Sequence, residues 1–118
     1  MHIYVHEPRE DRLDGLLTEL RSEKLVPKPI DDAFFDRDLS LLNRPGSTGN
    51  AMLLAAVPGV EDRIVALRAA GCDNPVVVMR DFRNARETAV LLDRGADEVV
   101  VAPVKAVELK ARVNAILR

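Results

Sequence analysis

Cysteine and aromatic residues are scarce in this sequence, and basic residues are not in excess over acidic ones. It has one cysteine, Cys72, four Phe and Tyr residues together and no tryptophan. A single cysteine excludes a disulfide within the chain and a metal site made of cysteine ligands. Acidic residues slightly outnumber basic ones, and the net charge is -2. Surfaces that bind nucleic acid or anionic membranes are usually basic, so the charge balance points to neither partner.

Long apolar runs are also missing. The longest covers residues 51–57 and is too short to cross a bilayer. The chain enters a strand-like segment at residue 2, without the pattern of a signal peptide. Hydrophobic residues nevertheless make up 47% of the 118 residues, as in a folded domain. We expect one cytoplasmic domain over 1–118, with no membrane partner, metal or cofactor.

The segment from Gly95 to Pro103 shows how the chain is built. A helical pattern ends at Gly95, a typical helix terminator, and an apolar run without alternation follows over 99–102. Such runs are typical of strands covered on both faces. Pro103 ends the strand because it has no N–H, and an amphipathic helix follows over 105–117. Helix, glycine, buried strand and helix in this order are typical of a parallel α/β sheet.

The same unit recurs through the chain without sequence repeats. The pattern predicts strands over 2–6, 25–29, 51–56, 75–79 and 99–102 and helices over 10–22, 32–42, 60–70, 84–94 and 105–117. Right-handed crossovers then place helices on both faces of the sheet. We therefore predict a flavodoxin-like, doubly wound (βα)5 fold with the strand order 2-1-3-4-5.

Ligands of such folds bind where the strands end at their carboxyl edge, next to the point where the strand order reverses. No glycine-rich phosphate loop follows the first strand, and Glu7 and Glu10 would repel phosphate there. This argues against a nucleotide-binding enzyme. His6 lies beside the same edge, where an imidazole can respond to pH, although packing is its simpler role.

Four short motifs, in the order of the predicted elements, resemble the receiver domains of response regulators. They are Pro58-Gly59 after the third strand, the strand 74–79, the turn Gly95-Ala-Asp-Glu and the helix 108–113, Glu-Leu-Lys-Ala-Arg-Val. The last resembles the OmpR/PhoB class of transcription factors. The first and fifth strands also resemble atypical regulators of flagellar genes in alphaproteobacteria. The resemblance covers the whole chain.

A receiver transfers a phosphoryl group from a histidine kinase to its own aspartate. The resemblance implies an aspartate after strand 3, an acidic pair for Mg²⁺ after strand 1, a hydroxyl after strand 4 and a lysine after strand 5. The corresponding residues, which we call the degenerate pocket, are Glu7, Ala55, Ala56, Arg80, Asp81, Ala102 and Pro103. Alanine is no nucleophile and a lone carboxylate is a poor magnesium site. We expect neither enzymatic activity nor phosphorylation of the usual kind.

Two residues of the degenerate pocket have alternative roles. The guanidinium of Arg80 either enters the pocket, pairs with Glu7 or Asp81 and replaces the metal's charge, or it points to solvent. Glu7 is either a remnant metal ligand or a carboxylate that is solvated or paired with an arginine.

OmpR/PhoB-type receivers dimerise through the face formed by their fourth helix, fifth strand and fifth helix. The resemblance places the following residues on that face: Arg86, Thr88, Asp97, Glu98, Val107, Glu108, Ala111 and Arg112. Glu98 and Arg112 retain one of three ion pairs of the family. Thr88 stands where Glu108 would find a basic partner, and Arg86 is its substitute. The alternative is a solvated charged face, which contributes little energy.

We expect a phosphorylation-independent receiver that serves as the dimerisation or regulatory module of a transcriptional regulator. DNA would be bound only through a domain outside this chain. The alternative is a stand-alone pseudo-receiver that docks a histidine kinase or another signalling protein.

Overall fold

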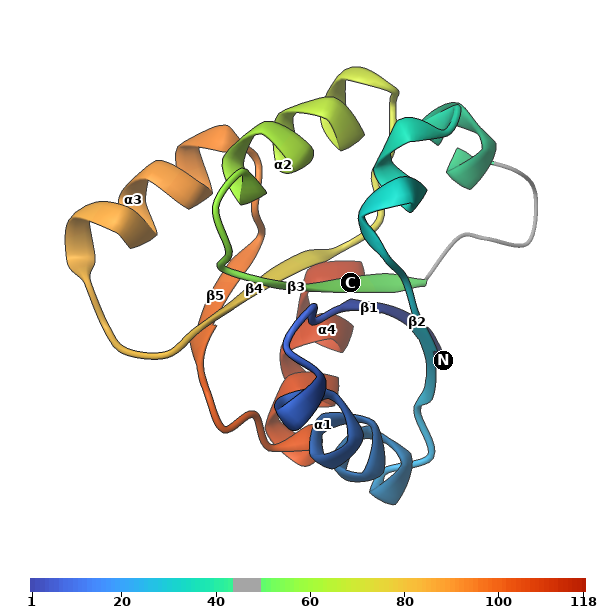
Figure 1. Cartoon of the computed structure of the whole chain (residues 1–118), viewed down its shortest axis with the longest axis vertical. Coiled ribbons are helices and arrows are strands. Elements are labelled where there is room, and N and C mark those ends of the chain that lie inside the picture. The colour runs from blue at the N-terminus through green and yellow to red at the C-terminus, as the bar shows by residue number, and fades with distance from the viewer. Residues whose placement is uncertain (44–49) are drawn as a thin grey trace.

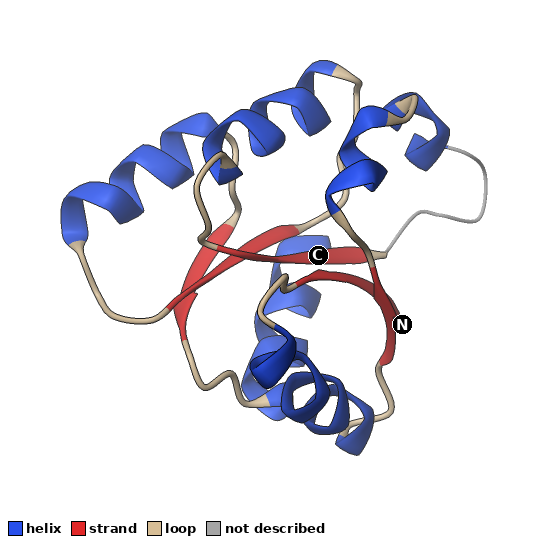
Figure 2. Cartoon of the chain, viewed as in Figure 1, coloured by secondary structure: helices blue, strands red, loops and turns tan. Residues whose placement is uncertain are grey.

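A computed structural model describes residues 1–43 and 50–118 and shows a five-stranded parallel sheet (Figures 1 and 2). The sequence also predicts a loop over 45–50, and all of it except Asn50 lies outside these residues. The strands are β1 (His2–His6), β2 (Val26–Pro29), β3 (Ala51–Ala55), β4 (Val76–Arg80) and β5 (Glu98–Val101). Their order is β2-β1-β3-β4-β5. The predicted fold class and strand order are therefore confirmed.

Four α-helices cover the two faces of the sheet. They are α1 (Glu10–Ser22), α2 (Val60–Ala69), α3 (Ala85–Arg94) and α4 (Ala106–Leu117). Helices α1 and α4 lie on one face, and α2 and α3 lie on the other (Figure 1). Within the described part of the chain, no helix has the length and apolarity needed to cross a membrane.

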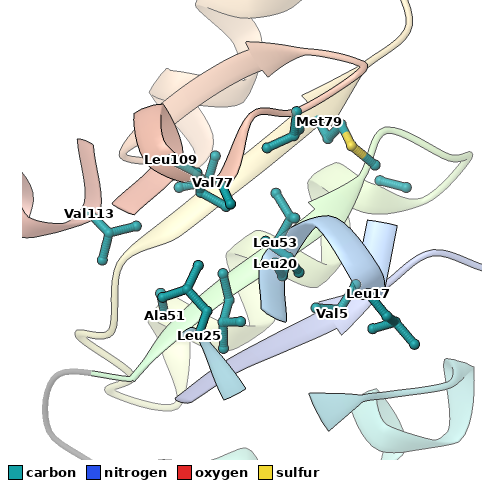
Figure 3. Packing of buried hydrophobic residues seen from close by; sticks show 14 residues of the cluster. Val5, Leu17, Leu20, Leu25, Ala51, Leu53, Val77, Met79, Leu109 and Val113 are labelled. Atoms are coloured by element: carbon teal, nitrogen blue, oxygen red, sulfur yellow. The ribbon is translucent and has the colours of Figure 1, made fainter. Parts of the chain in front are cut away.

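The central strands have apolar runs because both of their faces are covered. Every residue of β3 is buried, and so are the first four of β4. Alternate side chains enter two separate hydrophobic clusters, one on each face. Figure 3 shows the first cluster, in which Leu53 and Val77 of the sheet lie among side chains of α1 and α4, including Leu20 and Leu109.

The predicted helix over 32–42 is wrong. Two short 3-10 helices, η1 (Asp32–Asp36) and η2 (Leu39–Asn43), take its place. Arg37 between them is extended, and the carboxylate of Asp38 accepts hydrogen bonds from both the backbone N–H and the hydroxyl of Ser40. Such local bonds compete with helical ones, and here they interrupt the apolar periodicity that suggested one helix.

A single arginine joins the second face of the sheet to the turn before β5. Arg68 of α2 donates to the carbonyls of Cys72, Asn74 and Gly95 and to the carboxylate of Asp97, over 2.8–3.0 Å. Gly95 ends α3 with a φ of 121°. A Cβ added there would lie 2.8 Å from Cγ of Arg68. Both the backbone angle and the contact therefore favour glycine.

We predict that Gly95→Ala lowers the free energy of unfolding by about 1–3 kcal/mol, because alanine strains the backbone at this φ. Gly15→Ala is the matched control. Gly15 lies inside α1 and an added Cβ there meets no atom within 4 Å, so the change should stabilise the protein by about 0.5–1 kcal/mol. Urea denaturation followed by circular dichroism measures both. Equal stabilities of the two variants would contradict the strain at Gly95.

Candidate functional site

The carboxyl ends of four strands bring the residues of the degenerate pocket to one edge of the sheet. Strand β3 ends at the buried Ala55, and the exposed Ala56 donates its N–H to the carbonyl of Met79 over 2.9 Å. At the end of β5, the N–H of Ala102 donates to the carbonyl of Arg80 over 2.7 Å. The Ala102–Pro103 peptide bond is cis. The ends of β3 and β5 thus present methyl groups to this edge.

Glu7 follows β1 directly, and its side chain is completely buried. Three donors of a single residue, Arg9, satisfy this carboxylate. The backbone N–H and Nε of Arg9 donate to Oε1 over 2.9 and 2.7 Å, and Nη2 donates to Oε2 over 2.8 Å. Two parallel bonds of this kind give an arginine–carboxylate pair both strength and a fixed geometry.

The same guanidinium extends the network to β4. Nη1 of Arg9 donates to Oδ2 of Asp81 over 2.9 Å, and Arg12 of α1 donates to Oδ1 of Asp81. Asp81 follows Arg80 at the end of β4. The series Glu7, Arg9, Asp81 and Arg12 therefore alternates in charge and connects β1, the start of α1 and the loop after β4.

The titration of Glu7 reflects two opposing effects. Burial by itself raises the pKa of Glu7, but the hydrogen bonds and charge of Arg9, with a contribution from Arg12, outweigh it and hold the pKa below its usual value. The pKa of Asp81 is also lowered, first by the hydrogen bond from Arg12 and then by that from Arg9. Both carboxylates are therefore ionised at neutral pH.

Of the two roles considered for Glu7, the structure shows the arginine-paired carboxylate. Both of its oxygens accept from Arg9, so a positive group already occupies the place at which a cation would bind. Among the described residues, no group of three His, Cys, Asp or Glu side chains is arranged to hold a metal ion. The end of β3 offers no oxygen nucleophile, since Ala55 and Ala56 stand there.

Arg80 does not play the role proposed for it. Its guanidinium neither meets Glu7 or Asp81 nor points to solvent, because its side chain is only 12% exposed. It pairs with Glu87 of α3 and lies over the ring of Phe82, 5.6 Å from the ring centroid. Arg9 supplies the positive charge instead. The sequence analysis did not identify Arg9 as the partner of Glu7. One signal was present, because an arginine at the N-terminus of a helix, the positive end of the helix dipole, is unusual.

His6, next to Glu7, is buried and belongs to a different network. Its Nε2 lies 2.8 Å from Oδ1 of Asp32, and Nη1 of Arg63 lies 3.3 Å from the same nitrogen. The hydrogen bond from His6, followed by that from Arg63, lowers the pKa of Asp32. Phe35 meets the imidazole edge-on, at a centroid distance of 5.4 Å. These contacts anchor η1 to β1 and α2, which is a packing role.

The face expected to dimerise corresponds to α3, β5 and α4, because a pair of 3-10 helices replaces the second helix. Arg112 donates to Glu98 and to Glu108 of the same chain, each over 2.8 Å. Val107 is 63% exposed. Arg86 and Ala111 are exposed as well, whereas Thr88 is half-buried. An exposed apolar side chain thus lies beside a cluster of charges.

Asp97 differs from the other residues proposed for that face, since its bonds reach α2 and β4 and not α4. Oδ2 accepts from Arg68 over 2.8 Å and from the backbone N–H of Val76 over 2.9 Å. Asp97 therefore joins α2 to the start of β4, and this role accounts for its presence without a partner chain.

No family model matches the chain, and neither does any curated protein. Solved structures, in contrast, match it over nearly its whole length. The receiver domain of the Francisella response regulator 1452 is 17% identical and matches with a TM-score of 0.75 over 98% of this chain and 95% of that one. The beryllofluoride-activated NtrC4 receiver domain dimer is 15% identical, with a TM-score of 0.75 and the same two coverages.

A further match is an atypical orphan response regulator with a phosphorylation-independent regulatory mechanism. It is 15% identical and matches with a TM-score of 0.75 over the whole chain and 96% of its own length. These similarities show that the chain has the fold of response-regulator receiver domains.

We predict that Arg9→Gln lowers the free energy of unfolding by about 2–4 kcal/mol at pH 7, because it leaves the buried carboxylate of Glu7 without its cation. The loss should shrink on acidification. With Arg9 present, the pKa of Glu7 is lowered in the folded state. The ionised carboxylate therefore contributes to the free energy of unfolding above about pH 4.5, and this contribution is lost as pH falls through the folded-state pKa. Without Arg9, burial raises the pKa of Glu7 above its usual value, so the penalty shrinks as pH falls through that raised pKa.

Arg12→Gln is the matched control, because Arg12 pairs only with the exposed Asp81 and such pairs contribute little. Urea denaturation between pH 4 and pH 7 provides the comparison. Similar losses in the two variants, or a loss for Arg9→Gln that does not change with pH, would contradict the assigned role of Arg9.

Proposed function

We propose that this domain is a degenerate receiver of the OmpR/PhoB type, which acts without phosphorylation as the dimerisation or regulatory module of a transcriptional regulator. It is not an enzyme. The observation that carries the proposal is the internal ion pair between Arg9 and the buried Glu7, at the edge where β3 ends in alanine. A site of this kind neither accepts a phosphoryl group nor needs a metal to balance its charge.

The chemistry of the site supports this proposal independently of any relative. Phosphoryl transfer requires a nucleophile in line with the phosphorus and cations that stabilise the developing charge. Ala55 and Ala56 offer no nucleophile, and Ala102 offers no cation. The similarity to an atypical orphan response regulator with a phosphorylation-independent mechanism agrees with this conclusion. The motif resemblances suggest control of flagellar genes, with DNA bound through a domain outside this chain.

The proposed dimer uses the α3–β5–α4 face. Glu98, Glu108 and Arg112 form a network that can be shared across a two-fold axis, and Val107 provides apolar area beside it. An isologous interface of this kind needs only self-complementary patches, which a cluster of both charges satisfies. The beryllofluoride-activated NtrC4 receiver, one of the structural neighbours, is a dimer.

We predict that acetyl phosphate with Mg²⁺ changes neither the intact mass nor the oligomeric state of the protein. Mass spectrometry and sedimentation velocity of the same sample measure the two properties, and a receiver with an aspartate nucleophile serves as a positive control for the reagent. Detection of a phosphorylated aspartate would contradict the proposal.

We further predict that Val107→Asp weakens dimerisation at least about tenfold, since it places a charge in an apolar contact. Val26→Asp is the matched control, because Val26 is 46% exposed on β2, at the opposite edge of the sheet from β5. Sedimentation equilibrium gives both dissociation constants. A monomeric parent protein at high micromolar concentration, or equal effects of the two substitutions, would exclude this interface.

A further inference from the structure

A cleft with a volume of about 560 Å³ lies between α1 and the segment that connects β5 to α4, and it shares Asp81, Ala102 and Pro103 with the degenerate pocket. Its walls come from Arg12 to Glu19 of α1 on one side and from Ala102 to Lys105 on the other. Cavities that bind small molecules in proteins have volumes of about 300–1,000 Å³. The cleft also lies at the carboxyl edge of the sheet, where ligands of α/β folds bind.

The floor of the cleft is apolar and continuous with the hydrophobic core. Met79 and Val104 line the cleft and belong to the buried cluster between the sheet, α1 and α4, with exposures of 4% and 8%. Leu16 and Ala102 also line it and pack against the same cluster. An apolar group that enters the cleft would therefore rest on side chains already held by the core.

Gly15 forms part of the α1 wall, and neither packing nor backbone geometry explains its presence. It lies in the middle of α1, where glycine is less favourable than alanine. An added Cβ would meet no atom within 4 Å, and the residue is not among the glycines with positive φ. Because glycine has no side chain, the backbone of α1 is accessible to a ligand at this position.

Charged residues of both signs line the cleft. Arg12 pairs with Asp81, and the carboxylate of Glu19 accepts the N–H of Ala106 over 3.2 Å. Lys105 lines the cleft and is exposed, and no carboxylate of the described residues lies within ion-pair distance of its ammonium group. Lys105 is therefore the cation of the rim that is available to a ligand, whereas the carboxylate of Glu19 is held by the backbone N–H of Ala106.

We propose that this cleft binds a small amphipathic organic anion, with its apolar body on Leu16, Met79 and Val104 and its carboxylate beside Lys105. This inference goes beyond the proposed dimerisation and does not depend on it. A ligand of this class matches both the apolar floor and the single unpaired cation, whereas a neutral ligand would use only the floor.

Two probes that differ in charge alone test the proposal. The probes are 1-naphthaleneacetate and its neutral amide, 1-naphthaleneacetamide, titrated into the ¹⁵N-labelled protein and followed by amide chemical shifts. We expect saturable shifts that centre on Gly15, Leu16 and Lys105. The anion should bind about two- to fivefold more tightly than the amide, and this preference should decline at high salt, as for an exposed charge pair.

Three variants locate the binding. Gly15→Leu fills the open wall and should weaken both probes at least about tenfold. Gly15→Ala is its control, because a single methyl group extends less far into the cleft and should leave most of the affinity. Lys105→Gln should bind the anion and the amide equally. The amide spectrum of each variant verifies its fold, and Lys105→Gln changes only an exposed side chain, so the test remains valid if Gly15→Leu fails to fold.

The following results would overturn the proposal. No saturable shift with either probe at millimolar concentration would exclude a small-molecule site, and equal affinities of acid and amide for the parent protein would exclude an anion. Shifts that centre on the α3–β5–α4 face, or that Gly15→Leu leaves unchanged, would place the binding elsewhere. Sedimentation of the parent protein alone tests the dimer separately, so failure of one proposal is distinguishable from failure of the other.

Discussion

The buried carboxylate of Glu7 is the constraint on which the carboxyl edge of the sheet depends. A carboxylate without exposed surface must be neutralised or protonated, because an isolated charge is very costly in the protein interior. Arg9 meets this requirement from only two residues away, with two side-chain bonds and one backbone bond. The geometry requires Arg9 to stand where α1 begins. Its remaining guanidinium nitrogen then reaches Asp81 and holds the loop after β4.

In the proposed function, the Arg9–Glu7 pair takes the place of a metal ion, and the alanines after β3 separately remove the nucleophile. In a pocket that binds a divalent ion, acidic side chains repel one another until the ion arrives. Here the balancing charge is covalently attached, so the effective concentration of the cation is high and does not vary with magnesium. A conformational change also requires a ligand with different affinities for two states. In the proposed function, the paired Glu7 and Asp81 offer a metal no such difference, and the domain is controlled through other residues.

The strands and four of the five predicted helices follow from patterns that are local in the sequence. Apolar runs such as 51–55 identify strands buried on both faces, and glycines such as Gly95 mark helix ends because of their backbone angles. The prediction of a helix over 32–42 was wrong because apolar periodicity carries no information on side-chain hydrogen bonds such as those from Ser40 to Asp38. The site was predictable only as a set of strand ends. Which arginine would neutralise Glu7 was not predictable, since the sequence offers both Arg9 and Arg80 near the strand ends and only the three-dimensional path of the chain separates them.

The cleft and the α3–β5–α4 face are distinct surfaces that share one wall. Pro103, Val104 and Lys105 line the cleft on one side and a groove beside Arg112 on the other. A substitution in this segment affects both surfaces, so Lys105→Gln is judged only by the difference in affinity between the anionic and the neutral probe of the cleft. Gly15 and Val107 lie outside the shared wall, one on α1 and the other on the exposed side of α4. Because residues with no common partners contribute independently, changes at these two positions separate recognition of a small anion from recognition of a second chain.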